Sequence, residues 1–261
     1  MTDQPHSSWA EVYDIAYQRS FGNFYNCLTD ATVDLIVNGF LSSASIVDFG
    51  AGTGRLSIPL SLKGYAVTAV EPCQEMLIQL KRKDPHNSIT TVCARMEDFR
   101  GEGKFDLALC VFTVILYLLD KDSLTKSLAA AFEALRPDGM LLLDIPSEAI
   151  FRGYARSDPF FERTVAVTRN NGSIYTYRED LVVKNDDGEE TRYEDEFQIR
   201  HWSSQQVMGV LRELGFVDCE DLTPHFSAAG SSYYKFKKPN KTVVDNLLPA
   251  PSRNNPLDYN S

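Results

Sequence analysis

The chain of 261 residues is short of positive charge: 26 lysines and arginines stand against 36 acidic residues, a formal net charge of −10. Such a balance gives no general attraction to phosphate, so a nucleic acid or an anionic membrane is not an expected partner. The longest hydrophobic run, 107–119, is shorter than the ~20 residues that span a bilayer. The polar N-terminus lacks the apolar segment of a secretory signal. We therefore expect a cytoplasmic protein.

Cysteine is also scarce, with five residues that are scattered and form no C-x-x-C pair. An odd number at wide spacing predicts neither a disulfide framework nor a zinc site. We expect free thiols in a reducing compartment and no bound metal.

Strand-like apolar runs alternate with helical patterns through the first 145 residues. The predicted strands are 45–49, 66–71, 89–93, 105–111 and 140–145, and the predicted helices are 55–62, 74–83 and 124–135. Apolar strands separated by helices are typical of a parallel sheet that is covered on both faces. The pattern predicts an α/β, Rossmann-like, doubly wound and mostly parallel seven-stranded sheet, with its ligand site at the carboxyl ends of the strands.

The pattern changes after the fifth strand. Three long alternating segments, 162–169, 173–184 and 190–202, are joined by Asn-Gly and Asp-Gly turns, which are strong hairpin signals. They predict an antiparallel β-meander within an insert at 147–202, whose exposed strands could pair two subunits as a homodimer. Residues 157–202 carry 11 acidic against 6 basic residues, which would favour a cationic acceptor if they line the site.

The remaining segments complete one domain. Strands at 216–222 and 233–237 are expected to close the main sheet as an antiparallel pair, after a helix that ends near Gly215. The last residues, 239–261, are rich in proline and asparagine and predict a flexible tail. The expected division is a domain of residues 1–238 that contains the insert, followed by the tail.

A glycine-rich stretch, Asp48-Phe49-Gly50-Ala51-Gly52-Thr53-Gly54-Arg55, lies between a predicted strand and helix. Such glycines allow a tight turn and a close approach of ligand to backbone. Glu71 follows 17 positions after Gly54, where an acid can bind a ribose diol. A dinucleotide fingerprint would carry its third glycine at Arg55, and an acid at Asp48 favours a cationic ligand over a pyrophosphate.

With these residues the chain resembles the class I S-adenosylmethionine-dependent methyltransferases. It is most similar to a small-molecule branch, the amino-sugar N,N-dimethyltransferases of antibiotic biosynthesis. The matching segments are AEVYDIAY (10–17), VDFGAGTGRL (47–56), VEPCQEML (70–77) and RMEDF (95–99). The resemblance covers about residues 9–238 and implies S-adenosyl-L-methionine as cofactor, S-adenosyl-L-homocysteine as product, and a small molecule methylated on nitrogen or oxygen.

The resemblance also implies a cofactor site. Its residues are Tyr13, Asp48, Gly50, Ala51, Gly52, Gly54, Glu71, Pro72, Met76, Met96, Glu97 and Cys110. Asp48 and the glycine loop would approach the methionine part, Glu71 would hold the ribose hydroxyls, and Tyr13 would close over the sulfonium. Met96 and Glu97 would flank the adenine, while the carbonyl of Cys110 would lie near the cofactor amine.

No dedicated general base is predicted, because positioning alone accounts for much of methyl transfer from a sulfonium. The candidate catalytic residues are Tyr13, Tyr17, Tyr117, Glu148 and His201. Two alternatives stay open: a nicotinamide-dependent oxidoreductase, which the glycine spacing disfavours, and a non-catalytic cofactor-binding or interaction protein. A nucleic-acid or protein methyltransferase is opposed by the charge and by the lack of an NPPY-type motif.

Overall fold

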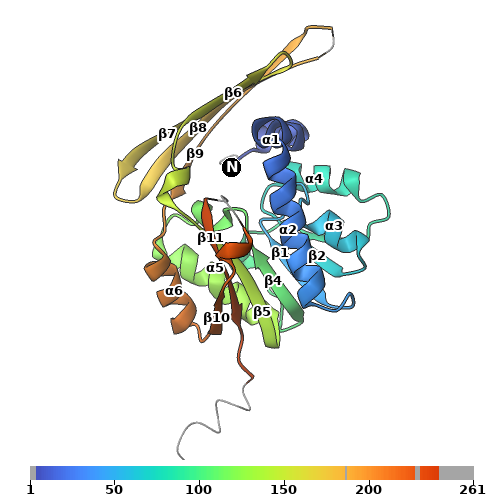
Figure 1. The fold of residues 1–261 in the computed structure, drawn as a ribbon, viewed down its shortest axis with the longest axis vertical. Helices are drawn as coiled ribbons and strands as arrows, with labels where there is room; N and C mark the ends of the chain where they lie inside the picture. Colours follow the sequence, from blue (N-terminus) through green and yellow to red (C-terminus); the bar gives the residue numbers. More distant parts are fainter. Residues whose placement is uncertain (1–3, 186, 227–229, 241–261) are drawn as a thin grey trace, which may run out of the picture.

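The computed structural model describes residues 4–185, 187–226 and 230–240. They form a large sheet covered by helices, with a second and smaller sheet above it (Figure 1). The segment 241–261 lies outside the described residues, so the expectation of a flexible tail stays a prediction.

The large sheet has seven strands in the order β10-β11-β5-β4-β1-β2-β3. The strands are β1 (Ser45–Phe49), β2 (Ala66–Val70), β3 (Thr90–Val92), β4 (Phe105–Cys110), β5 (Leu135–Pro146), β10 (Val217–Asp221) and β11 (Ser231–Lys237). The first five strands pair in parallel, and β11 runs antiparallel to β5 and β10. The predicted fold class is confirmed. In this topology the carboxyl ends of β1, β2, β4 and β5 share one edge, where ligands of doubly wound sheets bind.

Helices cover both faces of the large sheet. They are α1 (Tyr13–Phe21), α2 (Asn23–Gly39), α3 (Ser57–Leu62), α4 (Gln74–Lys83), α5 (Lys121–Ala134) and α6 (Ser204–Glu213), with short 3₁₀ turns η1 (Ser7–Val12), η2 (Met96–Asp98), η3 (Val114–Tyr117), η4 (Glu148–Ile150) and η5 (Thr223–His225). Leu128 of α5 and Leu211 of α6 pack on one face, and Ile36 of α2 and Leu80 of α4 on the other. The α5 start is fixed by a capping box in which Asp120 accepts from the Ser123 amide, an arrangement that stabilises a helix N-terminus.

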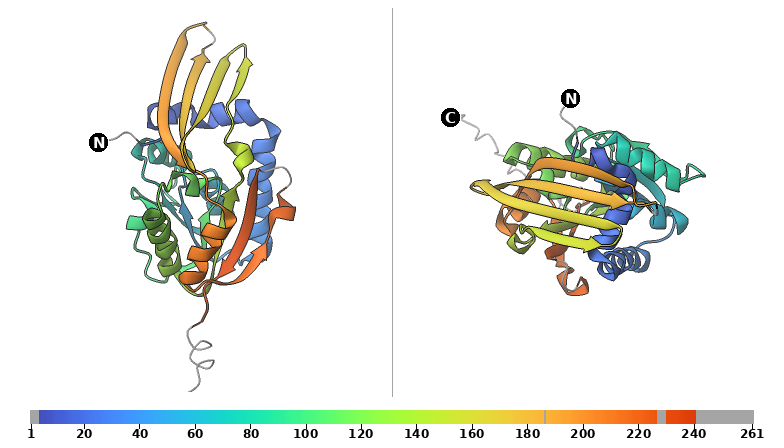
Figure 2. Two further views of the ribbon diagram at one scale, coloured as in Figure 1. Left: turned by 90° about the vertical axis from the view of Figure 1, so that its left-hand side faces the viewer. Right: turned by 90° about the horizontal axis from the view of Figure 1, so that it is seen from above.

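The smaller sheet follows β5 and has the antiparallel order β6-β7-β8-β9. Its strands are β6 (Tyr154–Asp158), β7 (Phe161–Asn171), β8 (Ile174–Lys184) and β9 (Glu190–Arg200). Phe161 and Leu181 on its inner face pack against Trp9 and Ala16 of the N-terminal segment, and Figure 2 shows α1 lying beneath the sheet. The predicted meander is confirmed, with β6 as an additional strand. The N-terminal segment is thereby placed between the two sheets.

No helix in the described part of the chain is long and apolar enough to cross a membrane. Within the same residues, no group of three or more His, Cys, Asp or Glu side chains is arranged to hold a metal ion.

Candidate functional site

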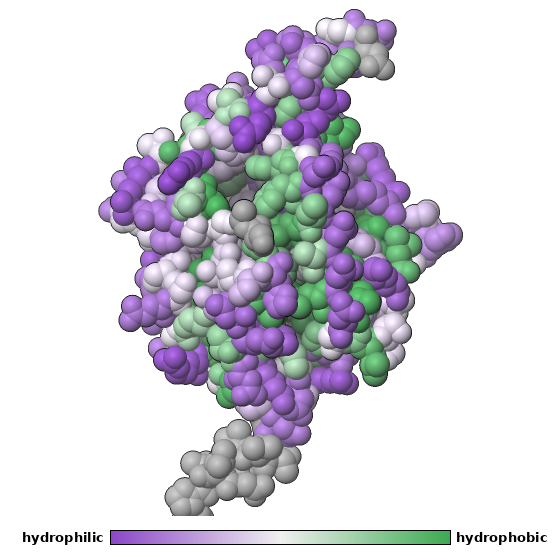
Figure 3. All heavy atoms as spheres, viewed as in Figure 1, coloured by the Kyte–Doolittle hydropathy of each residue, from purple (hydrophilic) through white to green (hydrophobic). Residues whose placement is uncertain are grey.

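A cavity of about 660 Å³ opens at the carboxyl-terminal edge of the large sheet. Its walls come from the loops after β1, β2, β3 and β4, from β5 and β11 of the large sheet, from the N-terminal segment and from β9 of the smaller sheet. Figure 3 shows hydrophobic residues around a hollow below the smaller sheet. The position is the one expected for the ligand of a doubly wound fold.

The glycine loop after β1 forms the floor of the cavity. Gly50 and Gly52 have φ angles of +66° and +55°, in the left-handed region that favours glycine. A Cβ at Gly50 would come within 2.6 Å of a Val114 methyl group, so a larger residue does not fit. A Cβ at Gly52 would meet no heavy atom within 4 Å. The backbone at Gly52 therefore faces open space in the cavity, as a ligand-binding loop requires.

Asp48 lies at the end of β1 and is only 4% exposed, although it lines the cavity. Its Oδ2 accepts a hydrogen bond of 2.6 Å from the Ser57 hydroxyl. Burial raises the pKa of Asp48 to about 7, and the negative charge of Glu71 contributes to the rise. A cation in the cavity would favour the charged form of this carboxyl.

Glu71 follows β2 and is held by the backbone of two loops. Its Oε2 accepts from the Gly52 amide and its Oε1 from the Cys73 amide, both at 2.9 Å. Burial raises the pKa of Glu71, while these two hydrogen bonds oppose the rise. Each carboxylate oxygen can accept a second hydrogen bond. Glu71 is therefore a fixed acceptor in the cavity wall, suited to a pair of hydroxyl groups.

Two methionines and an acid form the neighbouring wall. Met76 and Met96 are 3% and 7% exposed and line the cavity, together with Pro72. Glu97 also lines it, and its Oε2 accepts from the Ser127 hydroxyl at 3.2 Å. Polarisable thioethers beside one carboxylate can hold a flat heterocycle with an amino group.

Aromatic side chains line the upper part of the cavity. Tyr13 and Tyr17, one turn apart on α1, stack with ring centroids 4.4 Å apart, and Tyr25 and Tyr117 line the same space. Burial raises the pKa of Tyr13 and Tyr117 well above the ordinary value, and the neighbouring tyrosines add to the effect. These hydroxyls are therefore neutral at physiological pH and can relay a proton but not remove one as a phenolate.

Among the charged residues that line the cavity but were not assigned to the site from the sequence, Arg55 and Asp144 are the most buried. The Arg55 guanidinium lies 3.8 Å from the ring centroid of Tyr25 and 3.7 Å from that of Phe112. Asp144, at the end of β5, is fully buried; its Oδ1 accepts from the Thr113 amide, and its Oδ2 has no hydrogen-bond partner among the described residues. Burial raises the pKa of Asp144 to about 6. The sequence did contain signals for both residues. Asp144 is an acid within an otherwise apolar strand segment, and Arg55 stands where a dinucleotide-binding motif has its third glycine.

Four of the predicted site residues do not line this cavity. Gly54 faces α4, since a Cβ there would lie 2.9 Å from Leu80 Cγ. The Cys110 side chain is fully buried, and the next residue along the chain is the one that reaches the cavity. Glu148 is exposed on η4, and His201 packs edge-on against Phe151. Glu148 and His201 therefore lie apart from the cavity that holds the other candidate catalytic residues. The other residues predicted for the site all line one cavity.

Comparison with known proteins agrees with this geometry. Residues 46–139 match the family described as "Methyltransferase domain". One relative is a Geobacillus sp. (strain WCH70) protein that is named as a methyltransferase. It is 25% identical to this chain over 190 residues, which cover 67% of this chain and 74% of that protein.

Solved structures share the fold over most of this chain. An S-adenosylmethionine-dependent methyltransferase from Clostridium acetobutylicum gives a TM-score of 0.74 at 19% identity, covering 88% of this chain and 99% of its own. CalS10, an amino pentose methyltransferase from Micromonospora echinaspora solved with S-adenosylmethionine bound, gives 0.69 at 19% identity, covering 87% and 96%. At these identities the likeness shows a shared fold.

Residues 46–139 therefore match a methyltransferase domain, and the fold of the chain is the one found in solved S-adenosylmethionine-dependent methyltransferases. The matched residues contain β1 to β4 and the start of β5, and the smaller sheet follows them along the chain.

Proposed function

We propose that this protein transfers a methyl group from S-adenosylmethionine to the nitrogen of a small-molecule amine, with an oxygen acceptor as the second possibility. The observation that carries the proposal is a single cavity that joins two kinds of surface. One is the glycine loop with Asp48 and Glu71, and the other is an aromatic chamber with the buried carboxylate of Asp144.

The residues of the first surface fit the cofactor. Open space beside Gly52 leaves room for the methionine part, and the buried carboxyl of Asp48 suits its positive charge. Glu71, held by two backbone amides, would accept from the ribose hydroxyls. Met76, Met96 and Glu97 would surround the adenine, and Tyr13 would cover the sulfonium. When bound, the cofactor supplies an electrophilic methyl group on a good leaving group.

The second surface favours an amine. Aromatic faces such as those of Tyr13 and Tyr17 attract cations, and Asp144 Oδ2 offers a buried hydrogen-bond acceptor. The acceptor's lone pair forms the new bond to the methyl carbon as the carbon–sulfur bond breaks. The protein's contribution is to hold the two reactants in line, which can lower a barrier by about 7–11 kcal/mol in favourable cases. An amino sugar is a natural first probe, because CalS10 is an amino pentose methyltransferase.

Transfer of a radiolabelled methyl group to a panel of amino sugars, simple amines, phenols and carboxylic acids tests the proposal. We expect labelled amine products, and calorimetric binding of S-adenosylhomocysteine that a Gly52→Val variant loses while it stays folded. Binding of NAD without S-adenosylhomocysteine would support an oxidoreductase instead. Cofactor binding without transfer to any panel member would support a non-catalytic binding protein.

The proposal includes the cellular setting. The net charge of −10 supports a small-molecule acceptor in place of a nucleic acid. We place the protein in the cytoplasm, in a secondary-metabolite pathway, with the domain boundaries expected from the sequence. The smaller sheet ends in two edge strands, β6 and β9, which support pairing of two subunits. Sedimentation equilibrium tests this, and a monomer at micromolar concentration would contradict it.

A further inference from the structure

His6, which the sequence interpretation did not assign to the site, joins the cavity to a buried group of charges. It lines the cavity and is 6% exposed. Its Nε2 lies 2.9 Å from the hydroxyl oxygen of Tyr117, which lines the same cavity. Its backbone amide donates to Asp195 of β9 at 2.5 Å, which fixes the N-terminal segment against the smaller sheet.

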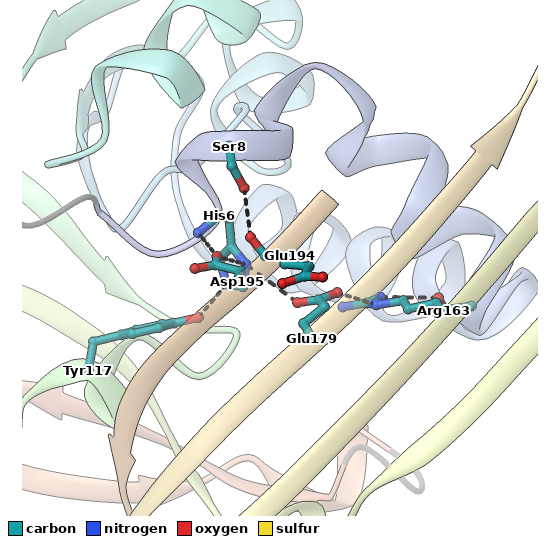
Figure 4. A network of polar contacts seen from close by, with 8 residues as sticks. His6, Ser8, Tyr117, Arg163, Glu179, Glu194 and Asp195 are labelled. Atoms are coloured by element: carbon teal, nitrogen blue, oxygen red, sulfur yellow. Dashed lines mark hydrogen bonds and ion pairs between the residues drawn. The ribbon is translucent and has the colours of Figure 1, made fainter. Parts of the chain in front are cut away.

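The other ring nitrogen of His6 faces two carboxylates. Nδ1 lies 3.8 Å from Glu179 Oε2 and 3.7 Å from Asp195 Oδ2. Neither His6 Nδ1 nor Glu179 Oε2 has a hydrogen-bond partner within the described residues. Figure 4 shows the His6 ring between the Tyr117 hydroxyl and the Glu179 carboxylate. A proton on Nδ1 is thus favoured by the facing negative charge, which leaves Nε2 to accept from Tyr117.

Arg163 holds Glu179 in place from the far side. Its Nε donates to Glu179 Oε1 at 2.5 Å, and its Nη1 donates to the Ser20 hydroxyl at 3.1 Å. The Arg163 side chain is fully buried and that of Glu179 is 1% exposed. A buried ion pair with an unused carboxylate oxygen is costly for stability alone. The arrangement is explained if that oxygen has a role toward His6.

We propose that His6 positions the Tyr117 hydroxyl to accept a hydrogen bond from an amine held at the point of methyl transfer, and that Glu179 takes up the proton that the amine loses. The proton passes from the amine nitrogen to Tyr117 Oη, while the Tyr117 proton moves to His6 Nε2 and the Nδ1 proton moves to Glu179 Oε2. Tyr117 ends unchanged, His6 changes tautomer, and the amine is left with a free lone pair. The inference rests on the proposed function.

The ionisation of the groups is consistent with this order. Burial, with the charge of Arg163, lowers the pKa of His6 to about 3, so His6 stays neutral and transmits a proton without storing it. Burial raises the pKa of Glu179 to about 7, where a carboxylate can gain and lose a proton under physiological conditions. The contact of 3.8 Å between His6 and Glu179 must shorten, as catalytic hydrogen bonds do when a ligand binds.

Sinefungin tests the inference without an identified acceptor, since it carries an amine where the cofactor carries its transferable methyl group. S-adenosylhomocysteine has nothing at that point, so the ratio of the two dissociation constants measured by calorimetry reports only the surroundings of the methyl position. We expect Tyr117→Phe and His6→Leu to reduce the preference for sinefungin about ten-fold or more, which is the loss of a hydrogen bond to a charged group. Binding of S-adenosylhomocysteine should change less than two-fold.

Two variants serve as controls. His6→Gln keeps an acceptor for the Tyr117 hydroxyl and should retain the preference, which distinguishes positioning from general packing. Tyr193→Phe removes a contact of 2.9 Å to Glu11 that also joins the N-terminal segment to the smaller sheet, and it should change neither affinity. An unchanged sinefungin preference in Tyr117→Phe, which removes a single oxygen, would overturn the inference. So would an equal loss in His6→Gln and His6→Leu. If the unmodified protein binds neither ligand, the proposed function itself fails.

Discussion

Replacement of Asp48 by asparagine should stabilise the folded protein while it weakens cofactor binding. Asp48 is 4% exposed and forms no ion pair with any residue that the structure describes, and its hydrogen bond to Ser57 does not offset the loss of water. In the absence of a cationic ligand, a buried charged carboxyl therefore destabilises the folded protein. Asparagine has nearly the same shape and no charge to bury, and its carbonyl can accept from the same hydroxyl.

The magnitude follows from the pKa of Asp48, which burial raises from 3.8 to about 7. Each unit corresponds to about 1.4 kcal/mol, so a charged Asp48 costs the folded state about 4 kcal/mol above pH 7. The raised pKa means that this cost is absent below pH ~3.8, where Asp48 is protonated in both states, and grows until the pH passes about 7. Between about pH 5.5 and 8 the cost therefore increases by about 2 kcal/mol.

Urea unfolding of Asp48→Asn and the unmodified protein at these two pH values measures the effect. The difference in free energy of unfolding should shift by about 2 kcal/mol in favour of the variant as the pH rises, whatever constant cost the amide adds. Titrating groups that do not interact with Asp48 cancel in the comparison. Calorimetry should show S-adenosylmethionine binding weakened about ten-fold or more. A stability difference that is the same at both pH values, or that falls as the pH rises, would refute the reasoning.

Three further predictions concern other parts of the site. Gly50→Ala should abolish cofactor binding, because its Cβ would lie 2.6 Å from a valine methyl group at a φ of +66°; Gly172→Ala, at +56° with open space, should lose about 1–2 kcal/mol of stability in thermal unfolding and keep full binding. Glu71→Gln should weaken S-adenosylhomocysteine about ten-fold in calorimetry, and unchanged affinity would remove Glu71 from the ribose site. Arg163→Met should cost about 3–5 kcal/mol in urea unfolding by leaving Glu179 unpaired, whereas adding Glu179→Leu should restore most of it; a single variant as stable as the unmodified protein would contradict a buried ion pair.

The main sheet could be predicted from the sequence because each strand carries its own signal. Mostly apolar runs such as 46–49 and 107–110 are too short for helices and stand next to glycines or helical patterns. The glycine loop and Glu71 were found for a similar reason: their spacing follows from the geometry of one turn and one strand end. Local rules therefore located the part of the cavity that we propose binds the cofactor.

The acceptor side could not be predicted in this way, because distant segments build it. His6 lies in a polar N-terminus without periodicity, and its partners Tyr117 and Glu179 are far away along the chain. Arg163 and Glu179 alternate with apolar residues on the covered face of the meander, where binary patterning expects hydrophobic side chains. Such violations of a local rule occur at functional sites, and here they are visible only once the strands are paired.

Some helix and strand boundaries in the structure differ from the predicted ones, for physical reasons that a short stretch of sequence does not show. The helix expected from Arg55 begins at Ser57, because Arg55 is held between two aromatic rings at the cavity. The strand β6 has no buried residue and, among the described strands, pairs with β7 alone, so its sequence lacks the alternation that marked its neighbours.

The central claim is that one cavity holds the cofactor on Asp48 and Glu71 and presents its reactive end to the tyrosine chamber. A crystal structure with S-adenosylhomocysteine bound tests it most directly. The account predicts the ribose hydroxyls within hydrogen-bond distance of Glu71 and the sulfur facing Tyr13 and Tyr117. A cofactor bound elsewhere, or a ribose that makes no contact with Glu71, would contradict it.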